Sequence, residues 1–275
     1  MKKFLIGLSA FVAVASVVTG SVVLVGAVNS SGIEIDNIFI PLNEHGQEIK
    51  IALISDIHYP FNKPKLEDIV SAIEECKPDV VFYAGDLIDA LAKKEEIDKI
   101  DSFLKSVSEI CNKQYAVLGN HETDNKNLSY FKQIVSKNGV ILLENEVCTI
   151  EVSGKKFALM GLNDNDEPND LSLEKIDSTL AKFLLAHRPE LFEEYIAENK
   201  NTPDIVFAGH ANGGLVRLFG KGVYSRNIGL FPKYTSGHYK KDGHHLIVSR
   251  GLGDGNGFRP RVFNSYHLPL IAVKI

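Results

Sequence analysis

Short apolar runs alternate with amphipathic stretches along most of the chain. Ten runs rich in Val, Ile, Leu and Phe have the length of a β-strand. These predicted strands are Ile49–Ser55, Asp79–Ala84, Gln114–Leu118, Val140–Leu143, Val147–Val152, Lys156–Gly161, Lys182–Ala186, Asp204–Ala208, His245–Ser249 and Leu270–Lys274. The predicted helices carry apolar residues at helical spacing, and they are Lys65–Cys76, Glu95–Cys111 and Asn127–Asn138. The alternation predicts one α/β domain.

The N-terminus follows a different pattern. Phe4 to Val28 form a run of 25 uncharged residues, long enough as a helix to cross a hydrocarbon core of about 30 Å. A secretory signal sequence is the alternative, although its apolar region usually has only about 7–15 residues. We expect residues 1–28 to be a transmembrane anchor or signal sequence, with the anchor favoured. Residues 29–48 are then a linker and entry segment, in which 29–32 is the polar linker, and residues 49–275 form the domain itself.

Composition and charge narrow the class of protein. With 44% hydrophobic and 24% charged residues the chain is globular, and its three cysteines fit neither a disulfide framework nor a thiolate zinc site. The segment from Gly209 to Ile275 has ten basic and two acidic residues, a net charge of +8, whereas the rest carries −13. This cationic segment either binds an anionic substrate or membrane headgroup, or neutralises acidic helices of the same fold.

Five of the predicted strands end in residues that can bind a metal ion. The segments that follow them are Asp56-Ile57-His58, Gly85-Asp86, Gly119-Asn120-His121-Glu122, His187 and Gly209-His210-Ala211-Asn212. In an α/β sheet the carboxyl ends of the strands form the edge where ligands bind, so these segments can converge. Oxygen and nitrogen ligands without thiolates suit Mn, Fe or Zn, and a shared carboxylate suits two ions.

The order of these segments resembles the calcineurin-like metallophosphoesterases over Ile49 to about Gly214. The resemblance implies a four-layer α-β-β-α sandwich that hydrolyses phosphate esters with two divalent ions. Two further stretches, Gly229–Tyr234 and Ser249–Gly253, resemble a membrane-anchored or exported bacterial subgroup of that family.

The resemblance also implies a role for each matching residue. Asp56 and His58 would hold the first ion and Asp86 would bridge both. Asn120, His187 and His210 would hold the second ion. His121 would face the substrate and protonate the leaving oxygen, a task that suits an imidazole. Asp89 either orients His121 or is a solvated loop acid.

The chain departs from the family pattern at two places. The family usually has a second histidine at the position of Asn212, where it completes the ligands of the first ion. An amide oxygen there is a weaker ligand, so we expect Asn212 to loosen that ion or favour Mn. Asp89 is followed by Ala90 and Leu91 instead of the Arg-Gly of the protein phosphatases. This difference disfavours a phosphoprotein phosphatase.

The sequence thus predicts a metal-dependent hydrolase of phosphate mono- or diesters, in which Arg250 could clamp the phosphoryl group. The substrate could be lipid-linked or part of the cell envelope. The domain would lie on the extracytoplasmic side of the cell membrane, held there by a single N-terminal helix, and its basic C-terminal region could also contact the membrane. The alternative is a non-catalytic tethered domain that binds a phosphorylated lipid or wall precursor. The basic segment contains no recognised groove-binding motif, so we expect no nucleic-acid partner.

Overall fold

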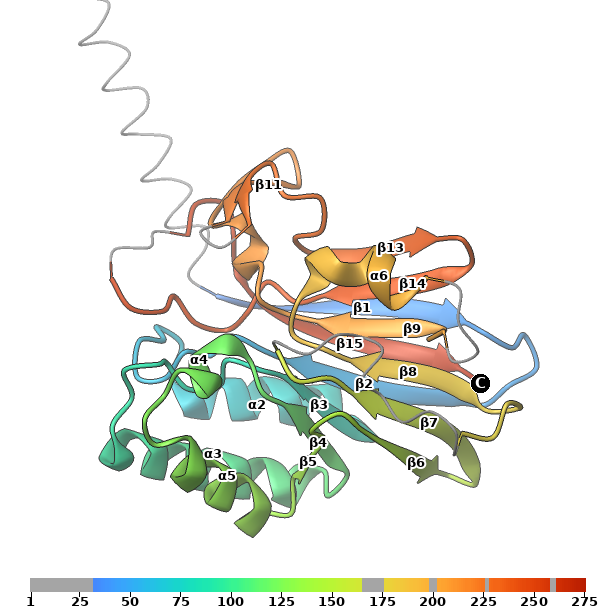
Figure 1. The fold of residues 1–275 in the computed structure, drawn as a ribbon, viewed down its shortest axis with the longest axis horizontal. Coiled ribbons are helices and arrows are strands. Elements are labelled where there is room, and N and C mark those ends of the chain that lie inside the picture. Colours follow the sequence, from blue (N-terminus) through green and yellow to red (C-terminus); the bar gives the residue numbers. More distant parts are fainter. Residues whose placement is uncertain (1–31, 165–175, 198–201, 226–227, 258–260) are drawn as a thin grey trace, which may run out of the picture.

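Two six-stranded β-sheets pack face to face at the centre of the protein (Figure 1). The computed structural model describes residues 32–164, 176–197, 202–225, 228–257 and 261–275. The first sheet consists, in spatial order, of β1 Ile33–Pro41, β15 Tyr266–Lys274, β2 Glu48–Ile54, β3 Val80–Ala84, β4 Gln114–Val117 and β5 Ile141–Leu142. The second consists of β13 Gly237–Lys241, β14 His244–Val248, β9 Ile205–Ala208, β8 Ala181–Leu185, β7 Lys155–Gly161 and β6 Glu146–Val152. In both sheets the central strands that lead into the predicted site run parallel.

The core between the sheets is built from alternate residues of their strands. Ile49, Ile51 and Leu53 of β2 lie in it, as expected for a strand whose successive side chains point to opposite faces. Phe82 of β3 meets Phe207 of β9 across the interface, with ring centroids 5.1 Å apart in an edge-to-face arrangement. Close packing of this kind fixes the position of one sheet relative to the other.

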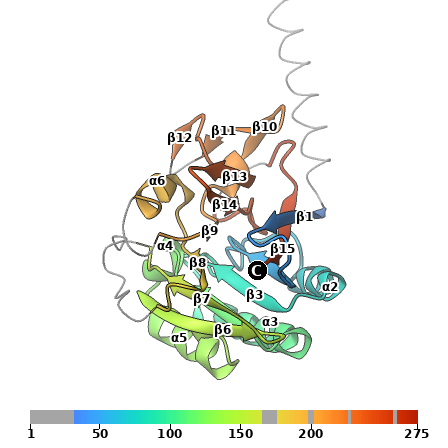
Figure 2. The ribbon, with the colours of Figure 1, turned by 90° about the vertical axis from the view of Figure 1, so that its right-hand side faces the viewer.

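Three helices cover the outer face of the first sheet (Figure 2). They are α2 Leu66–Cys76, α3 Lys94–Ile110 and α5 Leu128–Lys137. Each buries one apolar stripe, which in α3 consists of Ile97, Ile100, Phe103, Leu104 and Val107. The 3.6-residue periodicity predicted all three helices for this reason.

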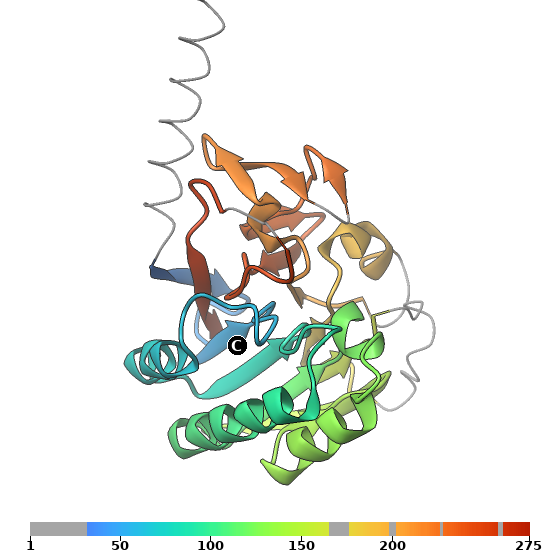
Figure 3. The same ribbon diagram turned by 90° about the vertical axis from the view of Figure 1, so that its left-hand side faces the viewer.

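The outer face of the second sheet carries shorter elements. The 3₁₀-helix η3 Pro189–Leu191 and the helix α6 Phe192–Tyr195 pack on it. A small antiparallel sheet of β10 Val216–Leu218, β11 Lys221–Ser225 and β12 Gly229–Leu230 lies at the end of the molecule opposite α3 and α5 (Figures 2 and 3). The expected layer order is present, but within the described residues the second helical layer is much thinner than the first.

The N-terminal part of the chain differs in one respect from the expected organisation. Residues 29–48 were expected to be a linker and entry segment outside the domain; within this range Ile33–Pro41 form β1, which pairs in parallel with β15 along its whole length. This segment therefore belongs to the first sheet. The predicted anchor Phe4–Val28 lies outside the described residues. Within the described ranges, no helix has the length and apolar character needed to span a membrane.

Candidate metal centre

The polar side chains expected at the strand ends meet at one edge of the two sheets, which faces the viewer in Figure 3. Asp56, Asp86 and Asn120 follow β2, β3 and β4 of the first sheet. His187 and His210 follow β8 and β9 of the second. The site therefore takes residues from both sheets, and the packing of the sheets determines its geometry.

One group of ligand atoms surrounds Nε2 of His187. This nitrogen lies 3.3 Å from Asp86 Oδ2, 3.2 Å from Asn120 Oδ1 and 3.0 Å from His210 Nδ1. The other ring nitrogen, Nδ1, donates a hydrogen bond to the Ala84 carbonyl oxygen at 2.6 Å. This bond keeps a proton on Nδ1 and leaves Nε2 to face the group as a ligand atom. His187 and the three side chains around its Nε2 are those expected to hold the second ion.

A second group of ligand atoms shares Asp86. His58 Nε2 lies 3.7 Å from Asp56 Oδ1 and 3.9 Å from Asp86 Oδ2. The ligand atoms of His58, Asp86 and His121 lie within 4.8 Å of one another, and so do those of Asp86, His187 and His210. Asp86 belongs to both groups, which is the position required of a carboxylate between two ions.

The centre is buried, and burial changes the protonation of its members. Burial raises the pKa of Asp56 to about 6, against the opposing effect of His187. Burial also opposes the charge of Asp86, but the neighbouring His187 outweighs it and lowers the pKa of Asp86 below its usual range. Burial and the charge on His187 lower the pKa of His210 to about 2. The His210 ring is therefore neutral at physiological pH, as a metal ligand must be.

These properties fit divalent cations. The charge of Asp86 overcomes the effect of burial and raises the pKa of His187 to about 10, so a proton is held among these atoms. Metal binding displaces such protons, because ligands bind in their deprotonated form. His210 Nε2 is buried without a hydrogen bond among the described residues. A set of carboxylates, imidazoles and an amide suits Mn, Fe or Zn.

The backbone of the ligand segments is strained. Asp56, Asp86 and His210 have φ angles of 50°, 57° and 61°, in the left-handed region that residues other than glycine rarely adopt. Such strain is typical of functional sites. Two neighbouring glycines make room for the carboxylates. A Cβ atom at Gly119 would lie 2.3 Å from Asp86 Oδ1, and one at Gly209 would lie 2.4 Å from Asp56 Oδ2.

His121 lies at the accessible side of the centre and is paired with Asp89. Its Nδ1 is 3.1 Å from Asp89 Oδ2, and its ring packs edge-on against His58 with centroids 4.5 Å apart. Burial opposes the imidazolium, but the hydrogen bond to Asp89 and the charge of Asp86 outweigh it and raise the pKa of His121. The pairing at Nδ1 leaves Nε2 as the ring atom that can reach a substrate. Of the two alternatives for Asp89, the structure thus shows the residue beside His121.

Glu122 is a part of the site to which the sequence analysis gave no role. It is 1% exposed, and its Oε2 accepts hydrogen bonds from the backbone N–H groups of Asp86 at 2.7 Å and Gly119 at 2.9 Å. Its Oε1 accepts one from Ile88 at 3.0 Å. Burial and the charge of Asp86 raise its pKa to about 7. Glu122 ties the loop after β3 to the loop after β4, and so positions Asp86.

Asn212 contacts the centre through its amide nitrogen. Nδ2 donates to Asp56 Oδ1 at 3.2 Å, and Oδ1 accepts a hydrogen bond from Nη2 of Arg261 at 3.4 Å. Arg261 is 3% exposed and also donates to the carbonyl oxygen of Gly253 at 2.7 Å. Arg261 could not be predicted from a local pattern, because it lies 49 residues beyond Asn212. In this geometry Asn212 orients Asp56, and its role as a metal ligand stays a prediction.

The structure places Arg250 away from the ligand groups. Its Nη2 forms an ion pair with Glu34 Oε2 of β1 at 2.7 Å, and its Nε donates to the Ser265 carbonyl oxygen at 3.3 Å. The guanidinium of Arg250 thus pairs with the first sheet, and its contact with a phosphoryl group stays a prediction.

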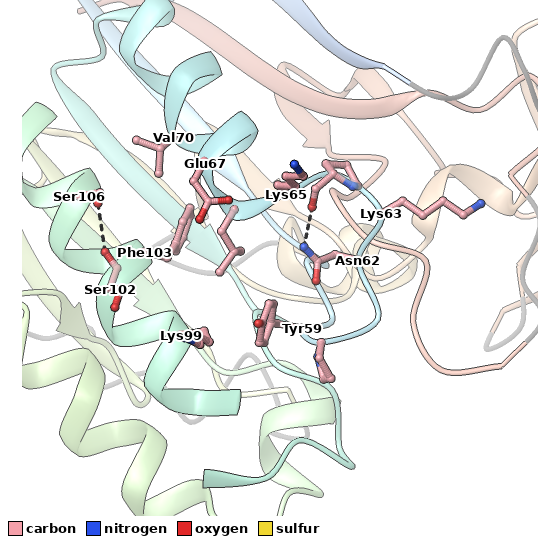
Figure 4. Close-up of a pocket in the computed structure, with 13 residues that line it drawn as sticks. Tyr59, Asn62, Lys63, Lys65, Glu67, Val70, Lys99, Ser102, Phe103 and Ser106 are labelled. Atoms are coloured by element: carbon pink, nitrogen blue, oxygen red, sulfur yellow. Dashed lines mark hydrogen bonds between the residues drawn. The ribbon is translucent and has the colours of Figure 1, made fainter. Parts of the chain in front are cut away.

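A groove of about 460 Å³ lies next to the centre, between the loop that follows His58 and the helices α2 and α3 (Figure 4). Tyr59 and Phe103 contribute apolar surface, and Lys63, Lys65 and Lys99 contribute positive charge. None of the metal-binding residues lines this groove. It is therefore a cavity separate from the metal centre.

Comparison with known proteins identifies the family. Residues 49–214 match the model of the calcineurin-like phosphoesterases, so the chain belongs to that family. It is 26% identical over 220 residues to the uncharacterized metallophosphoesterase YkuE of Bacillus subtilis, a match that covers 76% of this chain and 74% of YkuE. It is 24% identical over 265 residues to a transmembrane protein with metallophosphoesterase domain from Danio rerio, covering 87% of this chain and 57% of that protein.

A solved structure shares the fold. The NAD nucleotidase NadN of Haemophilus influenzae matches with a TM-score of 0.53 and 17% sequence identity, over 76% of this chain and 46% of that one. The chain thus spans less than half of that enzyme. Together the family match and the site geometry define the chain as a metal-dependent phosphoesterase, a hydrolase that acts on ester bonds.

Proposed function

We propose that the protein hydrolyses phosphate mono- or diesters with two divalent cations, Mn, Fe or Zn, and that its substrate is lipid-linked or part of the cell envelope. The observation that carries the reaction is the shared position of Asp86. It joins the group of His58 to the group of His187 and His210, within 4.8 Å in each group. A carboxylate in this position suits two ions that act together on one phosphoryl group.

The residues of the centre have different roles in this reaction. Asp56, His58 and Asp86 would hold one ion, and Asp86, Asn120, His187 and His210 would hold the other. Bound divalent cations supply charge stabilisation of the phosphoryl oxygens and activate water for attack on phosphorus. His121 donates a proton from Nε2 to the leaving oxygen, and Asp89 keeps the ring protonated and oriented through Nδ1.

We further propose that the protein is a single-pass membrane protein with this domain on the extracytoplasmic side. The run of 25 uncharged residues from Phe4 to Val28, preceded by Lys2 and Lys3, supports this placement. The printed name of the Danio rerio relative, which describes a transmembrane protein, is consistent with it. Release of the protein from membranes by alkaline carbonate would contradict an uncleaved anchor.

Hydrolysis of p-nitrophenyl phosphate and of bis-p-nitrophenyl phosphate tests the reaction. The chelator-stripped protein should be inactive, and Mn or Zn should restore release of p-nitrophenol. Asp86→Asn should lose both metal content and activity, whereas Asp124→Asn, a matched change at an exposed position, should lose neither. Metal content without turnover of either ester, with a phosphorylated lipid still bound, would identify the non-catalytic binding domain instead.

A further inference from the structure

The small sheet of β10, β11 and β12 exposes large apolar side chains to solvent. The described part of the chain has nine exposed large apolar residues, and five of them belong to this sheet and its turns. We call these five the cap surface: Leu218, Phe219, Tyr224, Leu230 and Phe231. Phe219 is fully exposed at the turn between β10 and β11, and Phe231 and Leu230 are 75% and 71% exposed. Tyr224 and Leu230 lie opposite each other on β11 and β12, and groups of exposed apolar side chains can mark binding surfaces.

The backbone holds two of these phenylalanines in an unfavourable conformation. Phe219 has a φ of 51° and Phe231 a φ of 50°. A bulky side chain rarely occupies this left-handed region, where a turn normally takes Gly or Asn. Neither ring gains burial that would offset the strain. Strained residues of this kind are found at functional sites. We therefore expect these two exposed rings to contact a binding partner.

The sequence that forms the cap surface is basic. Between Leu215 and Thr235 the sequence contains four basic residues, Arg217, Lys221, Arg226 and Lys233, and no Asp or Glu. Lys221 is exposed beside Phe219, whereas Arg217 is buried and Lys233, at 65% exposure, pairs with Glu193 of α6. A second copy of this chain would therefore bring like charges together in a symmetric contact. An anionic lipid surface offers the complementary charge.

The small sheet that carries the cap surface packs against the segment that carries His210 and Asn212. Buried Arg217 of β10 donates from Nη1 to the Gly213 carbonyl oxygen at 2.8 Å, in the segment that carries His210 and Asn212. The backbones approach so closely that a Cβ atom at Gly214 would lie 2.7 Å from the Cα of Gly222 in β11. A partner bound at the cap surface is therefore connected through the small sheet to the segment that carries His210 and Asn212.

We propose that the cap surface inserts its aromatic side chains into the interface of an anionic lipid membrane and so presents a lipid-borne phosphate ester to the metal centre. Exposed aromatic rings flanked by lysines are suited to this interface, where rings enter the headgroup region and cations pair with acidic lipids. The delivery of substrate rests on the proposed hydrolase function, whereas the insertion itself does not.

The chain contains no tryptophan, so a single introduced indole reports its own environment. We would prepare full-length Phe219→Trp and, as a control, Ile141→Trp. Ile141 is 48% exposed in β5, on the first sheet and away from the small sheet. Both proteins carry the same N-terminal segment, so any tethering affects them equally. With vesicles of phosphatidylglycerol and brominated phosphatidylcholine, the Phe219→Trp emission should shift to the blue and be quenched, while the Ile141→Trp emission should change little.

Two results would overturn insertion. Equal quenching of the two indoles would mean that the cap surface does not enter the bilayer. A blue shift of the Phe219→Trp emission that needs no lipid and grows with protein concentration would assign the surface to a second copy of this chain. Raising the salt concentration should weaken quenching in vesicles, because exposed charges are screened within about 10 Å at 0.1 M.

The kinetic consequence is tested separately. The double variant Phe219→Ser, Phe231→Ser should lose activity on a phosphate ester embedded in anionic vesicles and keep its activity on p-nitrophenyl phosphate. Equal activity of this variant and the native protein on both substrates would refute delivery. Insertion without hydrolysis of any ester would refute the proposed hydrolase function and leave membrane binding intact.

Discussion

His121 pairs through Nδ1 with Asp89, a carboxylate outside the two ligand groups, at 3.1 Å. If it donates a proton, the reaction needs the charged ring, so activity should fall as the pH rises through the pKa of His121. Asp89 raises that pKa. Asp89→Asn should therefore move the alkaline limb of the kcat/KM profile to lower pH, without loss of metal. His121→Gln should keep its metal and lose turnover by about 10²-fold or more.

The pH profile is measured at saturating metal, with Asp124→Asn as the matched control at an exposed position. Metal content is determined by mass spectrometry on the same samples. An alkaline limb that stays in place in Asp89→Asn would show that Asp89 does not act through His121.

Glu122 acts on a different part of the site, because its two oxygens accept three backbone hydrogen bonds. Glu122→Gln replaces one acceptor oxygen with an NH₂ group, which cannot accept and leaves a buried N–H without a partner. We expect a loss of about 1–3 kcal/mol in the free energy of unfolding and weaker metal binding, because Asp86 is no longer held in place.

Denaturant unfolding and metal titration measure the two effects of Glu122→Gln. Glu109→Gln, at an exposed position of α3, controls for the change of charge. Native stability together with native metal affinity would mean that Glu122 does not position Asp86.

At the scale of elements, the short segments after the strands depend on close backbone approach. Gly119 has a φ of −98°, so alanine there causes no backbone strain, but its Cβ would lie 2.3 Å from Asp86 Oδ1. Gly119→Ala should therefore displace the bridging carboxylate and weaken the binding of both ions. At Gly139, by contrast, a Cβ meets nothing within 4 Å, although the φ of 74° is unfavourable for alanine.

Gly139→Ala thus introduces backbone strain without a steric conflict, whereas Gly119→Ala introduces a steric conflict without backbone strain. Gly139→Ala should cost about 1 kcal/mol of stability and leave metal affinity unchanged. Calorimetric metal titration of Gly119→Ala and Gly139→Ala measures whether only the first variant loses metal affinity. If Gly119→Ala binds both ions with native affinity, the close approach has no part in forming the centre.

The elements that could be predicted from the sequence are those with an unambiguous period. All three long helices and the strands that lead to the ligands agree with the structure to within one or two residues. β1 was missed because, as an edge strand, it mixes polar and apolar residues and is half exposed. The strands of the small sheet were missed because they are short and present apolar side chains to solvent.

The ligand groups could be predicted because each residue directly follows a strand, and parallel strands end at one edge. Arg261 and the ion pair of Arg250 with Glu34 could not be predicted in this way. Both depend on contacts between residues far apart in sequence, which no local pattern records.

For the whole molecule, the packing of the two sheets determines whether the centre exists at all. Phe207 of β9 packs against Phe82 of β3 and, at a centroid distance of 5.7 Å, against Phe183 of β8. Phe207→Ala should cost about 3–5 kcal/mol of stability through the cavity that it leaves. Phe39→Ala, at a ring that is 55% exposed, should cost much less. Equal losses of stability in the two variants would mean that the aromatic rings packed between the sheets do not hold the sheets together.

Metal binding should offset part of that loss, because the ligands join the two sheets. Asp56, Asp86 and Asn120 come from the first sheet, and His187 and His210 come from the second. A ligand that binds only the native state at 100 times its Kd adds about 2.7 kcal/mol. Mn or Zn should therefore raise the Tm of the native protein and of Phe207→Ala, but not that of Asp86→Asn. An equal rise in Asp86→Asn would show that the ions bind elsewhere, and no rise in any of the three would show that the ions do not bind the native state.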